Sequence, residues 1–398
     1  MEILFVSAWF PFPQDTGSRI RIYHLLRALR ECHRVHLVAF LPSAKERAYL
    51  PATEALCASV SVVERDPFWR NPHLRLSAHF SLTPRDVLRS YSPEINRLVA
   101  DSVRRKAFDV IIASTLEAAP YVLQATGVPR ILEEHNFTTD WMQERYLDQG
   151  DPIRKTTAWI TWQKCQRYER QLYPHFQAVT MVSERDRQAV KKIMPEYSGR
   201  LEVIPNGVDL ESCQLGLAPP LPETIVFNGS LTYAANLEAM HWFVGQVLPL
   251  IRRKCPEVRL VITGQTEGVE TGWLAGDASI RLTGYLEDVR PAVAGSWLAI
   301  APLLSGGGTR LKILEAMALR TPVVATRKGA EGLVITPGAD VLIADSPDDF
   351  AAECLRLMEN PGLRQEIIKN ARRLVEQHYG WQAIGEEFRR LVEETAGK

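Results

Sequence analysis

The chain has 398 residues, of which 46% are hydrophobic and 24% charged, and 47 basic residues balance 47 acidic ones. This composition is average for a soluble globular protein and excludes a disordered or fibrous chain, while the length suits two domains. Zero net charge without a nucleic-acid motif argues against RNA or DNA binding. Residues 1–200 contain 28 basic and 22 acidic residues, so this half is the one expected to face an anionic partner.

The chain shows no sign of secretion or membrane insertion. Its six cysteines are scattered without a C-x-x-C motif, which is typical of reduced thiols in a cytosolic protein. The amino-terminal MEILFVSAWF has no basic region before its apolar residues, so it is interpreted as a buried strand and not as a signal peptide. The longest apolar candidate, Trp297–Leu304, has the length of a strand. We expect a cytoplasmic protein that contacts a membrane only peripherally.

In the first half, short apolar runs alternate with helical patterns, as in parallel sheets built from strand–helix–strand units. The segment Ser18–Cys32 has leucines and an isoleucine at helical spacing and predicts an amphipathic helix. Strands are expected at Ile3–Ser7, Val35–Phe40, Val60–Val63, Val110–Ser114, Arg130–Glu134 and Ala178–Val182.

The second half repeats this plan after the turn VIPNGVDL, residues 203–210. A long helix is expected from Leu237 to Ile251, and three more helices at the end of the chain. The predicted domains are residues 1–203, residues 204–379 and a terminal helix at 380–398 that packs back on the first domain. Strands are expected at Thr224–Phe227, Arg259–Thr263, Ile280–Thr283, Trp297–Ala301, Pro322–Ala325 and Val341–Ala344; the three final helices are expected at Pro347–Glu359, Gly362–Tyr379 and Trp381–Glu394.

The stretch SGGGTRLKILEAMAL, residues 305–319, has three glycines before a predicted helix and two cations, Arg310 and Lys312, in its first turn. Cations are disfavoured there because the helix amino terminus is already positive, so an anion is expected nearby. Glycines expose backbone N–H groups and, with the helix end, can form a phosphate cradle. This reading competes with a simple flexible turn.

Glu315 lies one helical turn after Lys312, on a helix whose buried stripe is predicted to be Leu311, Leu314 and Ala318. A carboxylate on such a helix needs hydrogen-bond donors, and the two hydroxyls of a sugar diol can supply them. Phosphates at one end and a diol one turn away describe a nucleotide. The alternative is that Glu315 pairs with Lys312 on a solvated face.

Several motifs together resemble the nucleotide-sugar-dependent glycosyltransferases of family 4. They are the first strand with its glycine turn, VIPNGVD, FNGS, LTGYLEDV, LEAMA-x-x-x-PVVAT, GAEGL and the final helix with its tryptophan, and they extend over nearly the whole chain. The resemblance implies an α/β fold of the GT-B type, with two Rossmann-like doubly wound domains facing across a cleft. GGGTRLKILEAMA with FNGSLTYAAN is similar to a subgroup associated with exopolysaccharide gene clusters.

The resemblance also implies a donor site. Glu315 matches the second glutamate of the family's E-x7-E signature and would hold the ribose hydroxyls, whereas Gly307 replaces the first glutamate. The usual Arg and Lys after the first strand of the second domain are absent, so we hypothesise that the charge that neutralises the diphosphate has moved to Arg310 and Lys312. The implied donor-binding residues are Gly17, Gly229, Ser230, Gly284, Tyr285, Gly306, Gly307, Gly308, Thr309, Arg310, Lys312 and Glu315.

His135, in ILEEHNF, matches the family's active-site histidine, and the adjacent Glu133 and Glu134 could tune its protonation. Without the resemblance, it reads equally well as a hydrogen-bonded histidine at a strand end. The implied mechanism is transfer with retention of anomeric configuration, in which the leaving diphosphate is stabilised by N–H groups and cations. Because the chain has no D-x-D triplet, we expect no bound metal, and no cofactor beyond the nucleotide sugar.

Two segments combine basic and aromatic residues: Asp66–Phe108, which includes Arg70 and Arg75, and Ala158–Tyr173. They would suit a glycan or lipid-linked acceptor at an anionic membrane surface, or they are ordinary solvated faces. Three alternative functions remain open from the sequence. They are a nucleotide-sugar epimerase of the same fold, a non-catalytic nucleotide-binding subunit and a nicotinamide oxidoreductase, although G-x-G-x-x-G is absent.

Overall fold

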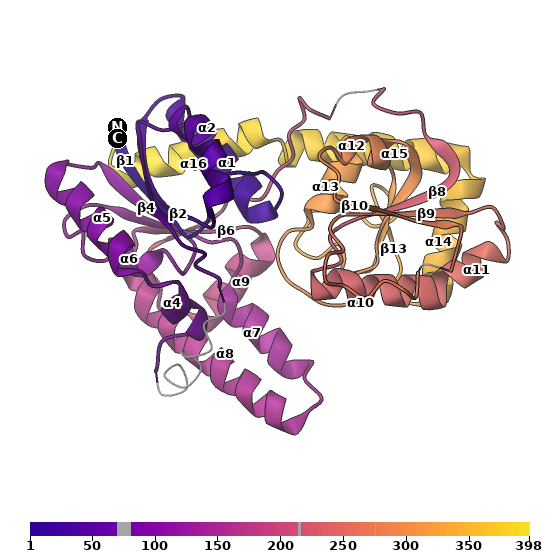
Figure 1. Cartoon of the computed structure of the whole chain (residues 1–398), viewed down its shortest axis with the longest axis horizontal. Coiled ribbons are helices and arrows are strands. Elements are labelled where there is room, and N and C mark those ends of the chain that lie inside the picture. Colours follow the sequence, from indigo (N-terminus) through magenta and orange to yellow (C-terminus); the bar gives the residue numbers. More distant parts are fainter. Residues whose placement is uncertain (70–80, 214–215, 275) are drawn as a thin grey trace. The chain divides into compact units, whose positions relative to one another are not determined.

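The computed structural model describes residues 1–69, 81–213, 216–274 and 276–398, so Arg70 and Arg75 of the first basic segment lie outside the described residues. The described residues form two compact units, each with its own parallel sheet (Figure 1). The first unit contains Met1–Asn206 and Gln382–Lys398, and the second contains Gly207–Trp381.

The sheet of the first unit has seven parallel strands among the described residues, in the order β3-β2-β1-β4-β5-β6-β7. The six predicted strands are confirmed, and the edge strand β7 was not predicted. The order reverses between β1 and β4, where Ser7 pairs with Ser114. Ligands of such sheets bind beyond the carboxyl ends of the strands at this point. The strands are β1 Glu2–Ser7, β2 Arg34–Leu41, β3 Ser59–Glu64, β4 Val110–Ser114, β5 Arg130–Glu133, β6 Ala178–Met181 and β7 Arg200–Val203.

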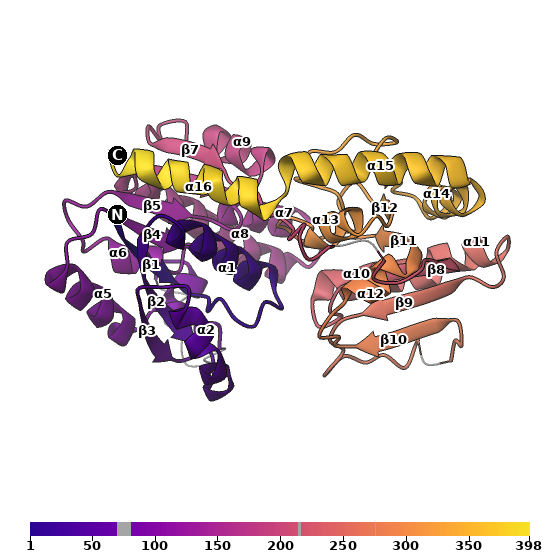
Figure 2. The same ribbon diagram turned by 90° about the horizontal axis from the view of Figure 1, so that it is seen from above.

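Helices cover both faces of this sheet. The predicted amphipathic helix is α1, which buries Ile22, Leu25, Leu26 and Leu29. The carboxyl-terminal helix α16 lies against α1, and a Cβ placed on Gly385 would lie only 2.6 Å from the Ala28 Cβ, so the close approach requires glycine (Figure 2). The helices are α1 Gly17–Arg30, α2 Leu50–Glu54, α4 Arg85–Ser90, α5 Pro93–Arg105, α6 Ala119–Val122, α7 Thr138–Leu147, α8 Pro152–Leu172, α9 Glu184–Ile193 and α16 Trp381–Thr395; Ala44–Tyr49 and Tyr173–His175 are 3-10 turns.

Helices α7 and α8 pack side by side as a hairpin that projects from the first unit (Figure 1). Asp151 caps α8 by accepting a hydrogen bond from the backbone N–H of Arg154. The tip of the hairpin exposes apolar side chains, with Leu147 61% and Ile153 80% exposed. The hairpin therefore presents an apolar surface that no described part of its own unit covers.

The second unit has a parallel sheet of six strands among the described residues, in the order β10-β9-β8-β11-β12-β13. All six strands were predicted. The order reverses between β8 and β11, so the loops after these two strands lie at the expected ligand position. The strands are β8 Leu221–Asn228, β9 Arg259–Thr263, β10 Ile280–Gly284, β11 Ser296–Ala301, β12 Val323–Ala325 and β13 Leu342–Ile343.

Both faces of the second sheet are covered by helices with separate apolar cores. One core contains Met240, Phe243, Ile251 and Phe350, and the other contains Leu314, Met317 and Val375. The predicted helix from Leu237 to Ile251 is interrupted by a π-helical segment at Phe243–Val247. The helices are α10 Ala234–Trp242, α11 Leu248–Arg252, α12 Arg290–Ala294, α13 Leu311–Ala318, α14 Pro347–Glu359 and α15 Pro361–His378. Both units are thus doubly wound, as the resemblance implied.

Candidate active site

His135 lies two residues beyond the end of β5, at the carboxyl edge of the first sheet. Its Nδ1 is 3.0 Å from the Ser18 hydroxyl and its Nε2 is 3.2 Å from a Glu133 carboxyl oxygen. Ser18 follows Gly17, the first residue of α1. The fold therefore brings the predicted glycine turn and the predicted catalytic histidine together.

Glu133 and Arg21 form a buried ion pair behind His135. Neither side chain is exposed, and Arg21 Nε donates to Glu133 Oε1 at 2.5 Å. Burial acts to raise the pKa of Glu133, but the Arg21 charge and hydrogen bonds from His135 and Ser114 outweigh it and hold this pKa well below its ordinary value. Glu133 is therefore a carboxylate at neutral pH.

The sequence did not single out Arg21. Its guanidinium also donates to the Pro205 carbonyl at 3.0 Å and to the Asn206 side chain at 3.1 Å, so it ties α1 to the PNG turn. An arginine on the face of α1 that carries the buried leucines was the available signal, because a buried arginine needs partners that lie elsewhere in the chain.

A second buried carboxyl group, Glu169 on α8, has a different environment. Its Oε2 accepts hydrogen bonds from the backbone N–H and the hydroxyl of Thr139. Burial raises the pKa of Glu169 to about 8. Burial and the charges of Glu169 and Glu117 also raise the pKa of Glu134 well above its ordinary value. Glu133 and Glu134 are thus adjacent in sequence, but their pKa values are shifted in opposite directions.

We expect the stability of the first unit to fall between pH 6 and pH 8 because of Glu169. Its pKa is raised in the folded state, so its contribution is full below the unfolded value of 4.5 and is lost as pH rises through about 8. Glu169→Gln removes this proton. Across these two pH units, the unfolding free energy of the wild type should fall by about 2 kcal/mol more than that of the variant. Urea unfolding at both pH values measures the difference, and parallel pH profiles would contradict it.

In the second unit, Glu315 on α13 lies beside the end of β8. Asn228, the last residue of β8, donates from its side-chain amide to Glu315 Oε2 at 2.5 Å. Burial raises the pKa of Glu315 to about 7, although the Asn228 hydrogen bond and Arg290 oppose this shift. One carboxyl oxygen is thus oriented by the sheet. The predicted stripe is confirmed for Leu314 and Ala318, whereas Leu311 is only half-buried.

Lys312 does not pair with Glu315. Its ammonium donates to Asn236 Oδ1 at 2.8 Å and lies 4.1 Å from the centre of the Phe227 ring. The Asn236 amide in turn donates to the Ser230 carbonyl at 2.8 Å. Burial and the nearby Arg310 charge lower the pKa of Lys312 to about 7.

The missing side chain of Gly229 makes this arrangement possible. A Cβ at residue 229 would lie 2.7 Å from Lys312 Nζ and 2.9 Å from Asn236 Nδ2. Lys312 therefore places its charge at the FNGS turn, although it is 83 positions further along the chain than Gly229. The lysine ammonium thus lies beside the turn after which the family's usual basic residues are absent, and its role in binding the diphosphate stays a hypothesis.

Arg310 has a different role from Lys312. It immediately precedes α13 and so lies just outside the first helical turn, in which it was predicted. Its guanidinium donates to the carbonyls of Gly307 at 2.8 Å and Gly306 at 2.6 Å. Only 6% of Arg310 is exposed. Gly306 and Gly308 have φ angles of +95° and +81°, which favour glycine. Arg310 thus braces the glycine loop from inside.

The remaining predicted donor residues lie in the glycine loop after β11 and in the turns at the ends of β8 and β10. Gly284 ends β10 with φ +69° and its carbonyl accepts from the backbone N–H of Gly264, which the sequence reading missed. A Cβ on Gly264 would lie 2.6 Å from the Ser230 backbone nitrogen, so this turn packs against the FNGS turn. Tyr285 is 57% exposed. Thr309 lies in the glycine loop, and its hydroxyl is buried.

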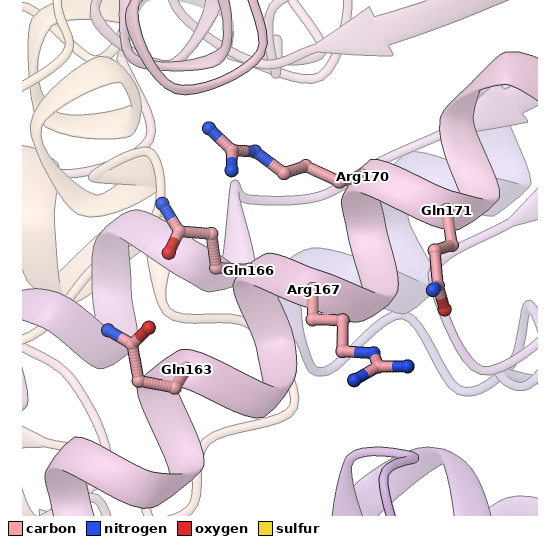
Figure 3. A pocket seen from close by; sticks show the side chains of 5 residues that line it. All are labelled: Gln163, Gln166, Arg167, Arg170 and Gln171. Carbon is pink, nitrogen blue, oxygen red and sulfur yellow. The ribbon is translucent and has the colours of Figure 1, made fainter.

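A hollow on α8 is lined by three glutamines and two arginines (Figure 3). Arg170 donates to the Ile193 carbonyl, so it holds the end of α9. The hollow contains no predicted site residue. The lining residues are Gln163, Gln166, Arg167, Arg170 and Gln171.

Over the described ranges, no three His, Cys, Asp or Glu side chains are grouped so that they could hold a metal ion. The same ranges contain no helix that is long and apolar enough to cross a membrane.

Comparison with known proteins decides the family. A model described as Glycosyltransferase Family 4 matches residues 16–212, and a model described as Glycosyl transferases group 1 matches residues 222–360. The chain is a family 4 glycosyltransferase. A curated relative of this glycosyltransferase is an uncharacterized 44.6 kDa protein in the cps region of Klebsiella pneumoniae, 22% identical over 95% of this chain and 96% of that protein.

A further relative of this glycosyltransferase is the phosphatidyl-myo-inositol mannosyltransferase of Mycolicibacterium smegmatis, 28% identical over 49% of this chain and 52% of that protein. Among solved structures, sucrose-phosphate synthase from Thermosynechococcus elongatus matches with a TM-score of 0.72 and 15% identity, covering 99% of this chain and 98% of that one. Anabaena HepE in complex with UDP matches with a TM-score of 0.66 and 16% identity, covering 99% and 100%. These matches confirm the GT-B fold.

Proposed function

We propose that this enzyme moves a hexosyl group from a nucleotide-diphosphate sugar to a glycan or lipid-linked acceptor, with retention of configuration, in the synthesis of an exopolysaccharide or another cell-surface glycan. The observation that carries the donor assignment is the pair of groups on α13. Lys312 offers an ammonium at the FNGS turn, and Glu315 offers a carboxyl group beside Asn228 one helical turn later. This spacing suits a diphosphate and a ribose diol.

The donor is proposed from this geometry and from the neighbours' own ligands. HepE was solved with UDP and with UDP-glucose, so UDP-glucose is the first donor to test. The ammonium of Lys312 and the N–H groups of the glycine loop would stabilise charge on the leaving diphosphate. His135 would lie near the transferred sugar, and we propose that the reaction needs no metal or additional cofactor.

The acceptor class is supported by surface chemistry. The α7–α8 hairpin exposes an apolar surface that would suit contact with a membrane carrying a lipid-linked acceptor. The relative from the cps region of Klebsiella pneumoniae supports a role in cell-surface glycan synthesis. The exposed apolar residues of the hairpin are Leu147, Ile153, Trp159 and Ile160.

A thermal-shift screen tests the donor site. With ligand at a hundredfold its dissociation constant, the protein should gain about 2.7 kcal/mol of stability. We expect a shift with UDP and UDP-glucose that is lost in Glu315→Ala, because the ribose hydroxyls lose their acceptor. The exposed Glu359 at the end of α14 provides the matched control, Glu359→Ala, which should keep the full shift.

Other outcomes of the screen would contradict the proposal. A shift with nicotinamide cofactors alone would favour an oxidoreductase, and no shift with any nucleotide would contradict the donor site. A shift with nucleotide sugars but no turnover would favour a non-catalytic nucleotide-binding subunit. Where a donor is found, NMR of the product reports the anomeric configuration. An inverted product would overturn the retaining mechanism while leaving the donor site intact.

A further inference from the structure

The buried carboxylate of Glu133 is surrounded by donors. Arg21 Nε donates to Oε1, the Ser114 hydroxyl donates to Oε2 at 2.7 Å, and His135 Nε2 lies 3.2 Å from the same Oε2. An ionised carboxylate can only accept hydrogen bonds. The ring nitrogen that faces it must therefore carry a proton.

This requirement fixes the other ring nitrogen of His135. In a neutral imidazole, one nitrogen is a donor and the other an acceptor. With the proton on Nε2, Nδ1 is bare and accepts a hydrogen bond from the Ser18 hydroxyl, 3.0 Å away. In a neutral ring both nitrogens are thus assigned by their neighbours, and the ring lies between the end of β5 and the start of α1.

We propose that Glu133, with Arg21 as its counter-ion, is a positioning residue that keeps the neutral ring of His135 in its Nε2–H form and directs Nδ1 toward the Gly17 turn. The arrangement follows the general logic of a catalytic histidine oriented by a buried acid. Here the orienting acid ends strand β5, two residues before the histidine, and its charge is balanced by Arg21 on helix α1.

Arg21 extends the hydrogen-bond network to Asn206, where the chain leaves the first unit. It donates to Pro205 and Asn206, and Gly207 begins the second unit. One buried ion pair thus holds the His135 ring, the first turns of α1 and the segment that leads to the second unit. A change at any of these points shifts the others, because the buried carboxylate has no solvent to replace a lost donor.

The ring assignment is tested by 15N NMR of the full-length enzyme at pH 8, where an ordinary imidazole is neutral. Long-range 1H–15N spectra distinguish the two neutral forms, and comparison with His135→Gln identifies the signal among the nine histidines. We expect the Nε2–H form in the wild type and its loss or mixing in Glu133→Gln. Glu169→Gln, a buried acid-to-amide change elsewhere in the unit, should leave the signal unchanged.

The consequence for turnover rests on the catalytic role of His135 proposed above. Glu133→Gln should lower kcat roughly 10- to 100-fold with little change in the KM for the donor, since all the predicted donor residues except Gly17 lie in the second unit. If Glu133→Gln does not fold, Glu133→Asp keeps the charge but withdraws the carboxylate from Nε2, and the same loss of the Nε2–H form is expected.

Failure of the positioning role of Glu133 can be distinguished from failure of the catalytic role of His135. Retention of the Nε2–H form in both Glu133 variants overturns the positioning role. A changed ring form with unchanged kcat supports the positioning of the ring and overturns the proposed catalytic role of His135.

Discussion

Replacing Arg21 with methionine should destabilise the enzyme by about 3–5 kcal/mol, the largest loss that we expect from a single substitution outside the donor site. Methionine fills much of the volume but leaves Glu133 as an unpaired charge with 0% exposure. It also removes the donors to Pro205 and Asn206. Urea unfolding at pH 7 measures the loss.

The control for this prediction is Arg27→Met, the same change at an exposed position on α1. It should alter the unfolding free energy by no more than about 0.5 kcal/mol. The double variant Arg21→Met, Glu133→Gln should recover part of the loss, since no charge is then left unpaired. Equal effects of Arg21→Met and Arg27→Met would show that Glu133 has another counter-charge.

Affinity for UDP-glucose should be greatest near pH 7 and fall by up to about tenfold per pH unit on either side. The pKa of Lys312 is lowered to about 7, so above this pH the free enzyme loses the ammonium that would bind the diphosphate. The pKa of Glu315 is raised to about 7, so below this pH the carboxylate becomes protonated and accepts fewer hydrogen bonds from the ribose. Calorimetric titration between pH 5.5 and 8.5 measures the profile.

Two substitutions should each remove the fall in affinity on one side of pH 7; we call these two sides of the profile the alkaline limb and the acid limb. Lys312→Arg keeps its charge at high pH and should flatten the alkaline limb, whereas Glu315→Gln should flatten the acid limb. Lys312→Ala should weaken binding by roughly 10- to 100-fold at pH 7, the contribution of a hydrogen bond to a charged group. If the alkaline limb persists in Lys312→Arg, another group binds the phosphates.

The sequence was sufficient for most of the fold because buried parallel strands are continuous apolar runs separated by helical periodicity. The edge strand β7 escaped prediction because Arg200 and Glu202 make it polar, and the PNG turn beside it suggested a linker. The π-helical segment Phe243–Val247 also escaped, because one inserted residue hardly changes an apolar stripe.

The candidate site was predictable where a motif carries the chemistry and not where partners come from distant segments. Glu315, Lys312 and the glycine loop stand together in one stretch, and they remain donor-site predictions. The direction of the Arg310 side chain, which points into the glycine loop, was not predictable, since its acceptors are backbone carbonyls of that loop. Arg21 was missed because its partners Glu133 and Asn206 lie 112 and 185 positions away.

The contact between Gly229 and Lys312 also bears on how the family can vary. A side chain at residue 229 would occupy the volume that the Lys312 ammonium fills in its present rotamer, so the two cannot coexist without a shift of the lysine. A descendant of this chain could acquire a larger residue at position 229 only with a shorter side chain or another lysine rotamer at position 312. The two positions are therefore expected to change together among relatives, with the lysine shortened or in another rotamer wherever a side chain is present at residue 229.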